Sequence, residues 1–162
     1  EVAEAMERAR GTTRTCLEEV RRISQRLRPG VLADLGLLNS LSSLASDLTA
    51  RTGMPVTRGL VPGLPPLTPE SELVVYRVAQ EALTNVVRHA RATSVSLGLA
   101  RVGDSVVLTV TDDGTGGADV RRGTGIHGMH ERAQMVGGSL TVATPEGGGT
   151  TVRLSVPAAG TP

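Results

Sequence analysis

The sequence predicts an α+β fold of two layers, in which helices cover one face of a mainly antiparallel, mixed sheet. Two observations support this prediction. Apolar residues recur at steps of three and four in several long segments, as in amphipathic helices, and alternate with polar residues in short segments, as in half-buried strands. The expected order is helix, helix, strand, helix, two strands, helix, two strands. A length of 162 residues suits one such domain with an appendage.

The first expected helix covers residues 1–28 and has an apolar seam with a period of about 3.5 residues, the pattern of a coiled coil or helix bundle. The seam consists of Met6, Ala9, Thr13, Cys16, Val20, Ile23 and Leu27. One helix cannot bury such a seam by itself, so it predicts packing against a partner helix; packing on the rest of this chain is the alternative. Pro29 and Gly30 end the segment.

Three further helices are expected. Leucines at helical spacing fill 31–50, and "RTGMP" closes that segment. A second helix starts with Thr68 as its N-cap and Pro69 in its first turn, and ends near Ala92. A third covers "IHGMHERAQMV" and stops at the glycine pair 137–138.

The expected strands include one short strand, "VTRGL", before a proline-rich loop at 61–69. Residues 94–100 and 105–111 alternate and form one hairpin, and 139–144 and 150–156 form another across "PEGGG". The domains expected from this pattern are a helix at 1–28, a main domain at 29–158 and a frayed tail at 159–162.

Composition narrows the class of protein. The chain has no Phe, no Trp and one Tyr, so its core must be aliphatic. A formal net charge of +1 does not indicate nucleic acid as a partner. A single cysteine fits a reducing compartment, and no apolar run is long enough to span a bilayer. The chain begins with Glu1 rather than Met, so we expect a fragment of a longer protein, cytoplasmic itself and with the membrane attachment of its parent left open.

The segment "YRVAQEALTNVVRHA" carries polar side chains suited to binding or catalysis on a helix whose apolar face must also pack against the core. Glu81, Asn85, Arg88 and His89 share one face at helical spacing, opposite an apolar face. An Asn oxygen can bind Mg²⁺, a carboxylate can act as a base or orient a water, and a guanidinium can neutralise phosphate. The alternative is a solvated helix face, but apolar residues surround it too closely for full exposure.

Two glycine clusters, "DDGTGG" at 112–117 and "GTGIHG" at 123–128, lie beyond the central hairpin. Glycine lets backbone amides approach an anion, and the second cluster leads into a helix whose N-terminus suits phosphate. Each cluster alone could be a turn. The spacing of a P-loop is absent, and a dinucleotide fingerprint would need a βαβ unit that is not predicted here. Asp112 ends an apolar strand, where a carboxylate can accept a hydrogen bond from an exocyclic amine.

These motifs, "EALTNVVRHA", "DDGTG", "GTGIHGMHERA" and "GGGTTVRLSVP", closely resemble the ATP-binding domain of sensor histidine kinases, a branch of the Bergerat-type ATPase superfamily. The upstream "EEVRRISQRLRPGVLADLGLLNSL" resembles the nitrate-sensor subfamily, in which a dimerisation helix leads into that domain. The resemblance extends from Leu17 to Pro157. It implies a Bergerat-type fold, ATP and Mg²⁺ as ligands, a response regulator as partner and a homodimer in the parent.

The resemblance also implies roles for individual residues. Asn85 would hold the Mg²⁺ and Glu81 would be the acidic residue of the same motif, while Arg88 and His89 would contact phosphates or ribose. Asp112 would recognise the adenine amine. The remaining nucleotide-binding positions would be Gly114 and Gly116 at the pocket floor, Gly123, Gly125 and Gly128 at the phosphates, and Thr150 on the adenine side. Residues 117–124 would form a short ATP lid.

The chain departs from the family pattern at three points. Gly117 stands where a Phe is common, His130 stands where the subfamily usually has Arg, and no acceptor histidine is recognisable in 1–28. His127 and His130 have the spacing of a metal pair, but no third ligand is evident. A serine kinase of the anti-sigma-factor type and a non-catalytic nucleotide-binding scaffold remain as alternatives on the same fold.

Overall fold

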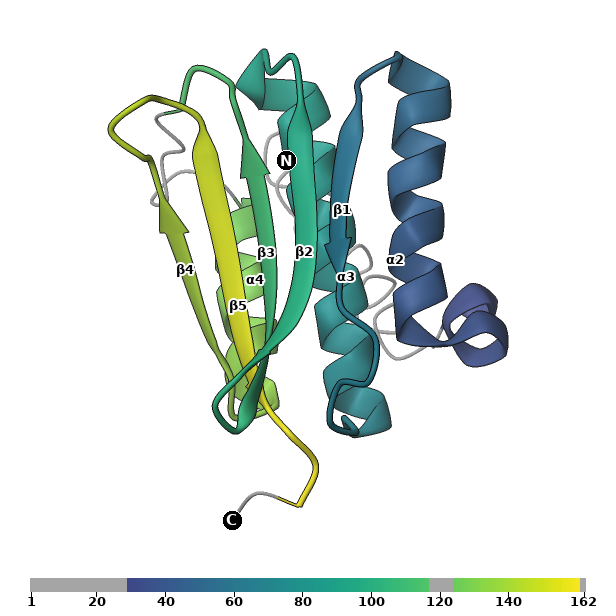
Figure 1. Cartoon of the computed structure of the whole chain (residues 1–162). Coiled ribbons are helices and arrows are strands. Elements are labelled where there is room, and N and C mark those ends of the chain that lie inside the picture. The colour runs from purple at the N-terminus through teal and green to yellow at the C-terminus, as the bar shows by residue number, and fades with distance from the viewer. Residues whose placement is uncertain (1–28, 117–123, 161–162) are drawn as a thin grey trace, which may run out of the picture.

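The computed structural model describes residues 29–116 and 124–160, in which a five-stranded sheet is covered by helices on one side (Figure 1). The strands are β1 (Val56–Leu60), β2 (Val95–Val102), β3 (Ser105–Asp112), β4 (Ser139–Ala143) and β5 (Thr150–Pro157). Their order in the sheet is β1-β2-β3-β5-β4. Helix α3 (Pro69–Asn85) and helix α4 (Thr124–Met135) lie behind the sheet, and α2 (Gly30–Thr52) packs beside β1 and α3. The predicted two-layer α+β fold is confirmed.

The sheet is mixed because β1 pairs parallel with β2, whereas every other pairing is antiparallel. Helix α3 lies between β1 and β2 in the chain, and parallel neighbours need such a crossover. Both predicted hairpins form, with strand ends shifted by one or two residues. The register aligns Asp112 at the end of β3 with Thr150 at the start of β5.

Alternation places one face of the central strands in the core, although Val107 on the other face of β3 is also buried. Val106, Leu108 and Val110 of β3 are buried on this face, and Val152 and Leu154 of β5 lie opposite the last two. Full burial of one such aliphatic side chain contributes about 1.5–3 kcal/mol. The core contains one aromatic residue, Tyr76 of α3, so aliphatic packing supplies the rest, as composition predicts.

Helix α2 has a kink that its leucine pattern does not reveal. Gly36 has φ 73° and ψ 173°, so the first turn is set off from the long helix that follows (Figure 1). The Ser40 hydroxyl donates to the Gly36 carbonyl at 2.7 Å and to the Val31 carbonyl at 3.0 Å, which joins the two parts. Gly53 closes α2 in a left-handed conformation, as expected for a C-terminal glycine.

Helix α3 begins as the sequence predicts, because the Thr68 hydroxyl accepts a hydrogen bond from the Ser71 N–H at 3.1 Å and Pro69 stands in the first turn. It ends differently. Residues Val86–Ala90 form a π-helical turn, η1, and Arg91 then adopts a left-handed conformation with φ 51°. A non-glycine residue in that region costs on the order of 1 kcal/mol, so surrounding contacts must hold it there.

The C-terminal part follows the expected order. Helix α4 starts two residues before the predicted Ile126 and ends at the glycine pair, where the Gly138 N–H donates to the Ala133 carbonyl at 2.9 Å. Ala159, which the sequence placed in a frayed tail, donates its N–H to the Pro66 carbonyl at 2.8 Å. The predicted helix at 1–28 lies outside the described residues.

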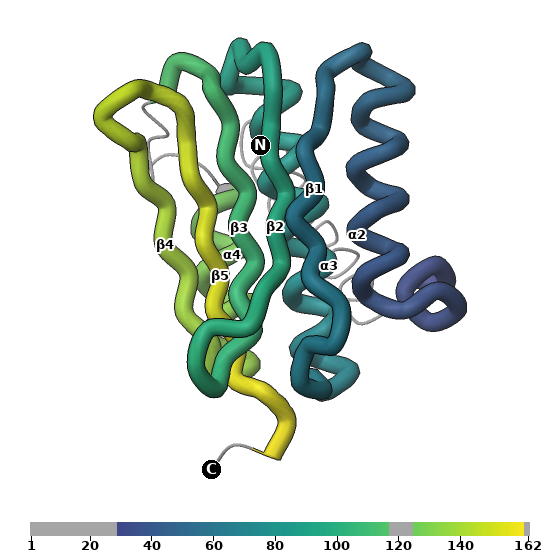
Figure 2. Tube along the Cα trace, viewed as in Figure 1, coloured from purple at the N-terminus to yellow at the C-terminus, as the bar shows by residue number. Residues whose placement is uncertain are grey.

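Three chain segments meet at one end of the sheet. The C-terminal end of β3, the turn between β4 and β5, and the junction between η1 and β2 all lie at the upper end in Figure 2. Hydrogen bonds join them: the Gly149 N–H donates to the Gly114 carbonyl at 2.8 Å, and the Thr115 N–H donates to the Ala90 carbonyl at 2.8 Å. The predicted site residues therefore lie at this end of the sheet or on segments that lead to it.

Candidate nucleotide site

Glu81 and Asn85 form the polar part of α3 that packs toward α4. Both side chains are half-buried, while the nearby Val78, Ala82 and Val86 are buried in the core. The two polar residues are four positions apart in regular α-helix, so they lie one turn apart on one face. This half of the predicted polar face is confirmed by the helix geometry.

Arg88 and His89 belong to the π-helical turn η1 rather than to α3. The prediction that they share a face with Glu81 assumed 3.6 residues per turn throughout. A π turn is wider than an α turn, so the regular spacing of 3.6 residues per turn does not extend to Arg88 and His89. Both side chains are exposed at the end of the helix. Single π turns in helices are frequent at functional sites.

Asp112 is a carboxylate on the apolar face of the sheet. It follows Val106, Leu108 and Val110 at two-residue steps, and its exposed fraction is 6%. Its Oδ1 accepts a hydrogen bond from the Gly114 N–H at 2.9 Å. No hydrogen bond to Oδ2 is found among the described residues. A buried carboxylate with spare acceptor capacity at the end of a strand is a typical functional position.

Two glycines around Asp112 are required by close backbone contacts. A Cβ at Gly114 would overlap the Ala90 carbonyl oxygen and lie 2.9 Å from the Ala90 Cβ. Gly149 has φ 78°, and a Cβ there would overlap the Asp112 carbonyl oxygen. The glycines of the two loops therefore allow the end of η1, the end of β3 and the β4–β5 turn to approach each other. Thr150, half-buried, follows directly.

Gly116 makes a similar contact farther along the loop. It has φ 66°, and a Cβ there would lie 2.7 Å from both the Gly149 carbonyl oxygen and the Thr144 Cγ2. Gly123 and the predicted lid at 117–124 lie outside the described residues, apart from the backbone of Thr124 at the start of α4. Gly117, which stands where a Phe is common, therefore also lies outside the described residues.

Helix α4 faces Glu81 through Gly125. A Cβ at Gly125 would overlap Glu81 Oε1 and lie 3.7 Å from Asn85 Nδ2. One turn later, a Cβ added at Gly128 would lie 3.5 Å from Arg132 Nη1, an ordinary van der Waals contact. Arg132 is half-buried, and burial lowers the pKa of its guanidinium while the Glu81 carboxylate opposes that shift. Arg132 was not predicted from the sequence, since "HERA" also fits a solvated helix face.

Asp113 is the other residue that the sequence reasoning missed. Its carboxylate accepts hydrogen bonds from Thr93 and Ser94, twenty residues upstream. An Asp before a Gly signals a turn, but the identity of its partners depends on the fold.

The possible metal pair, His127 and His130, lies on α4, where the His127 Nε2 is 3.4 Å from Glu131 Oε1. Within 29–116 and 124–160 no cluster of metal-ligating residues forms around it.

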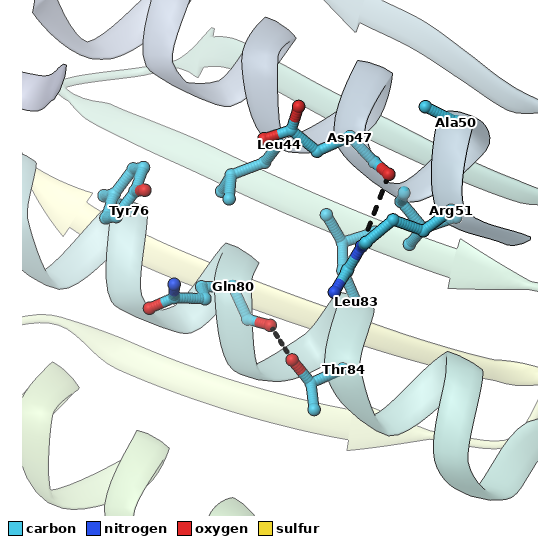
Figure 3. Close-up of a pocket in the computed structure, with 9 residues that line it drawn as sticks. Leu44, Asp47, Ala50, Arg51, Tyr76, Gln80, Leu83 and Thr84 are labelled. Atoms are coloured by element: carbon cyan, nitrogen blue, oxygen red, sulfur yellow. Dashed lines mark hydrogen bonds between the residues drawn. The ribbon is translucent and has the colours of Figure 1, made fainter.

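A separate cavity of about 460 Å³ lies between α2 and α3 (Figure 3). It is lined by Leu44, Asp47, Leu48, Ala50, Arg51, Tyr76, Gln80, Leu83 and Thr84. In Figure 3 the lining hydrogen bonds are local to each helix: Arg51 donates to the Asp47 carbonyl at 3.4 Å and Thr84 donates to the Gln80 carbonyl at 2.7 Å. None of the predicted site residues lines this cavity.

Comparison with known proteins places this arrangement in a family. Residues 70–160 match the model of the histidine kinase-, DNA gyrase B- and HSP90-like ATPases. The chain belongs to this family. The match begins in the first turn of α3 and ends beyond β5, so it includes Asn85, Asp112 and both glycine clusters.

The similar proteins are sensor histidine kinases. The chain is 35% identical over 148 residues to the sensor histidine kinase YxjM of Bacillus subtilis (strain 168), with 89% of this chain and 35% of that protein covered. It is 33% identical over 161 residues to the oxygen sensor histidine kinase NreB of Staphylococcus carnosus (strain TM300), with 97% and 46% covered. The chain thus spans between a third and a half of the length of these two relatives.

A solved structure has the same fold. The histidine kinase domain of the blue-light-activated histidine kinase of Erythrobacter litoralis EL346 superposes with a TM-score of 0.61 at 26% identity, covering 76% of this chain and 61% of that chain. The resemblance found in the sequence is confirmed by these comparisons. In the described part of the chain, no helix is both long and apolar enough to cross a membrane.

Proposed function

We propose that this chain is the catalytic ATP-binding part of a two-component sensor histidine kinase. It would bind Mg-ATP and transfer the γ-phosphate to a histidine on a dimerisation helix. The observation that most supports it is Asp112, a buried carboxylate with a spare oxygen beside a loop that glycine alone can form. Such a carboxylate suits recognition of an exocyclic amine in a pocket otherwise lined by backbone and aliphatic groups.

The metal would be held near Asn85. Its half-buried amide lies on α3 opposite Gly125, next to the Glu81 carboxylate, and this set fits Mg²⁺, which takes few protein ligands and completes its shell with phosphates and water. When bound, the ion would neutralise charge on the phosphates. Glu81 would orient or deprotonate the attacking group, and Arg88 and His89 would contact phosphate or ribose.

The backbone amides near the start of α4 would complete the phosphate site. Free N–H groups at a helix N-terminus attract anions. Gly123, Gly125 and Gly128 would keep this approach open, and 117–124 would act as the lid. Gly114, Gly116 and Thr150 would shape the adenine side of the site. In this reading the protein's contribution is positioning and electrostatic stabilisation, which dominate phosphoryl transfer.

The partners follow from the same proposal. A response regulator would receive the phosphate, and residues 1–28 would form the second dimerisation helix of a homodimer in the parent protein. The chain itself would reside in the cytoplasm, where ATP and response regulators are available.

Calorimetry with ATP, with and without Mg²⁺, tests the binding step. Phosphotransfer tests the rest: the chain is incubated with labelled ATP, Mg²⁺ and a separate peptide that contains an acceptor helix. Acid-labile label on the peptide is the expected result, because phosphohistidine is hydrolysed in acid. Acid-stable label would favour a serine kinase, ATP binding without transfer would favour a scaffold, and absence of binding at millimolar ATP would contradict every version of the proposal.

A further inference from the structure

The carboxylate of Asp113 accepts four hydrogen bonds from two consecutive residues. Oδ1 accepts from the Thr93 N–H at 2.8 Å and from the Ser94 N–H at 2.9 Å. Oδ2 accepts from the Thr93 hydroxyl at 2.6 Å and from the Ser94 hydroxyl at 2.9 Å. The Asp113 N–H donates back to the Ser94 carbonyl at 3.4 Å. We call this arrangement of Asp113, Thr93 and Ser94 the carboxylate clamp.

The clamp joins two segments that the proposed function uses separately. Asp113 directly follows Asp112, the residue assigned to the base. Thr93 and Ser94 follow η1, at the end of the helix that holds Asn85. A second tie lies alongside, because both the Thr115 N–H and the Thr115 hydroxyl donate to the Ala90 carbonyl, at 2.8 Å and 3.4 Å.

Arg91 lies between the two ties in its left-handed conformation. A strained residue persists only where neighbouring contacts fix it, and the clamp and the Ala90–Thr115 bonds flank it directly. The same turn is fixed from the other side, since the Gly114 carbonyl accepts from the Gly149 N–H at 2.8 Å. Without the clamp, the segment after η1 loses its most extensive contact with the turn that begins at Asp112.

From this geometry we infer that Asp113 is a positioning residue, which holds the base-recognising Asp112 at a fixed place relative to the helix that bears Asn85. The inference rests on the proposed function, because it assigns Asp113 a role through Asp112. Asp113 itself is exposed and directs both oxygens at Thr93 and Ser94, so it has no need to touch the nucleotide.

The test compares two nucleotides, ATP and inosine triphosphate, which lacks the exocyclic amine. Affinities are measured by calorimetry with Mg²⁺ for the wild-type chain and for Asp113→Ala. If Asp113 acts through Asp112, the variant should lose about tenfold in ATP affinity, the scale of a misplaced charge-assisted hydrogen bond. Its affinity for inosine triphosphate should stay within about twofold, since that ligand gains no bond of this kind from Asp112.

Two further variants separate positioning from general damage. In Asp112→Asn, adding Asp113→Ala should cause no further loss of ATP affinity, because the residue that Asp113 positions is already disabled. Asp113→Asn should retain most of the ATP affinity, since its amide oxygen can accept from both N–H groups while its NH₂ group donates to the two hydroxyls. Asp104→Ala is the matched control: an exposed aspartate whose side chain pairs with Arg101 at 3.7 Å, away from the clamp.

Should Asp113→Ala fail to fold, Thr93→Val combined with Ser94→Ala decides the matter. This variant removes the two hydroxyl donors and leaves both N–H bonds, so it should lose part of the preference for ATP. Equal losses for both nucleotides, or an unchanged preference in every clamp variant, would overturn the inference. Failure of the wild-type chain to prefer ATP would instead overturn the assignment of Asp112, and this inference with it.

Discussion

Gly125 of α4 faces the Glu81 carboxylate of α3 so closely that no Cβ fits between them. A methyl group there would overlap Glu81 Oε1 and lie 3.2 Å from its Cδ. The start of α4 therefore lies directly over the polar face of α3, and the identity of residue 125 controls where the Glu81 carboxylate can lie.

Gly125→Ala should consequently impair function more than stability. The overlapping atom is the end of a flexible side chain, so rotation of Glu81 relieves the contact at a cost below about 1 kcal/mol. The displaced carboxylate should lower phosphotransfer to a supplied acceptor helix by about tenfold. Gly98→Ala in β2 serves as the control, because its new Cβ would meet only ordinary contacts at 3.8 Å. A large fall in melting temperature with normal transfer would contradict this account.

Gly149 and Gly147, two residues apart in one turn, should respond in opposite ways to alanine. A Cβ at Gly149 overlaps the Asp112 carbonyl oxygen in a backbone with φ 78°, whereas nothing lies within 4 Å of a Cβ at Gly147. Overpacking together with left-handed strain should lower the stability of Gly149→Ala by about 2–4 kcal/mol. Gly147→Ala should stay within about 0.5 kcal/mol of the wild type. Thermal unfolding followed by circular dichroism measures both stabilities. Equal melting temperatures for the two variants would show that the turn accommodates a side chain at position 149 and would contradict the prediction.

The sequence predicted the fold well because its strands have two different faces. In β3 the residues at two-residue steps from Val106 to Asp112 are buried, and that alternation is visible in the letters alone. The cap at Thr68 and the glycine stops of α2 and α4 are equally local signals. Such features depend on neighbours within about one turn, which a single sequence contains.

Other features depend on contacts between distant segments and could not be predicted. The π turn at Val86–Ala90 has no local signature, so the sequence assigned Arg88 and His89 to a continuous α-helix, whereas they lie in η1. The need for glycine at position 114 arises from Ala90, and the partners of Asp113 lie some twenty residues upstream. The sequence indicated that these glycines mattered, whereas the structure identifies what each one contacts.

Substitutions at Asp112 and at Asn85 should differ in how far their effect on ATP affinity depends on Mg²⁺. Asp112→Asn keeps the shape but would lose the proposed charge-assisted bond to the base, so ATP affinity should fall by about 10- to 100-fold whether or not Mg²⁺ is present. Asn85→Ala should weaken binding only when Mg²⁺ is supplied, because Asn85 would act through the ion. Calorimetry in Mg²⁺ and in chelator makes the comparison. An equal effect of Asn85→Ala without the metal would refute the division of roles.

Asp113 should make the domain sensitive to acid. Hydrogen bonds from Thr93 and Ser94 hold the pKa of its carboxyl far below the usual value, which is about 3.9 in an unfolded chain. Below that pH the unfolded chain binds a proton that the folded chain still refuses, so the contribution of Asp113 to stability is complete above about pH 4 and declines as the pH falls further. Asp113→Asn should remove this part of the dependence. Urea unfolding at pH 7 and at pH 3 should show a smaller difference for the variant; identical differences would contradict the clamp.

The chain alone should not phosphorylate itself efficiently. It has three histidines, and all of them lie on helices of the domain: His89 on η1, and His127 and His130 on α4. Transfer needs an imidazole that can approach the γ-phosphate in line, and a side chain fixed on a helix of the binding domain has little freedom to do so. Labelled ATP and Mg²⁺ should therefore leave the chain without stoichiometric acid-labile phosphate, whereas a longer protein that includes the preceding helix should be labelled. Strong labelling of this chain would show that it contains its own acceptor, and His130→Gln, compared with His127→Gln as the neighbouring control, would then identify which imidazole of α4 accepts the phosphate.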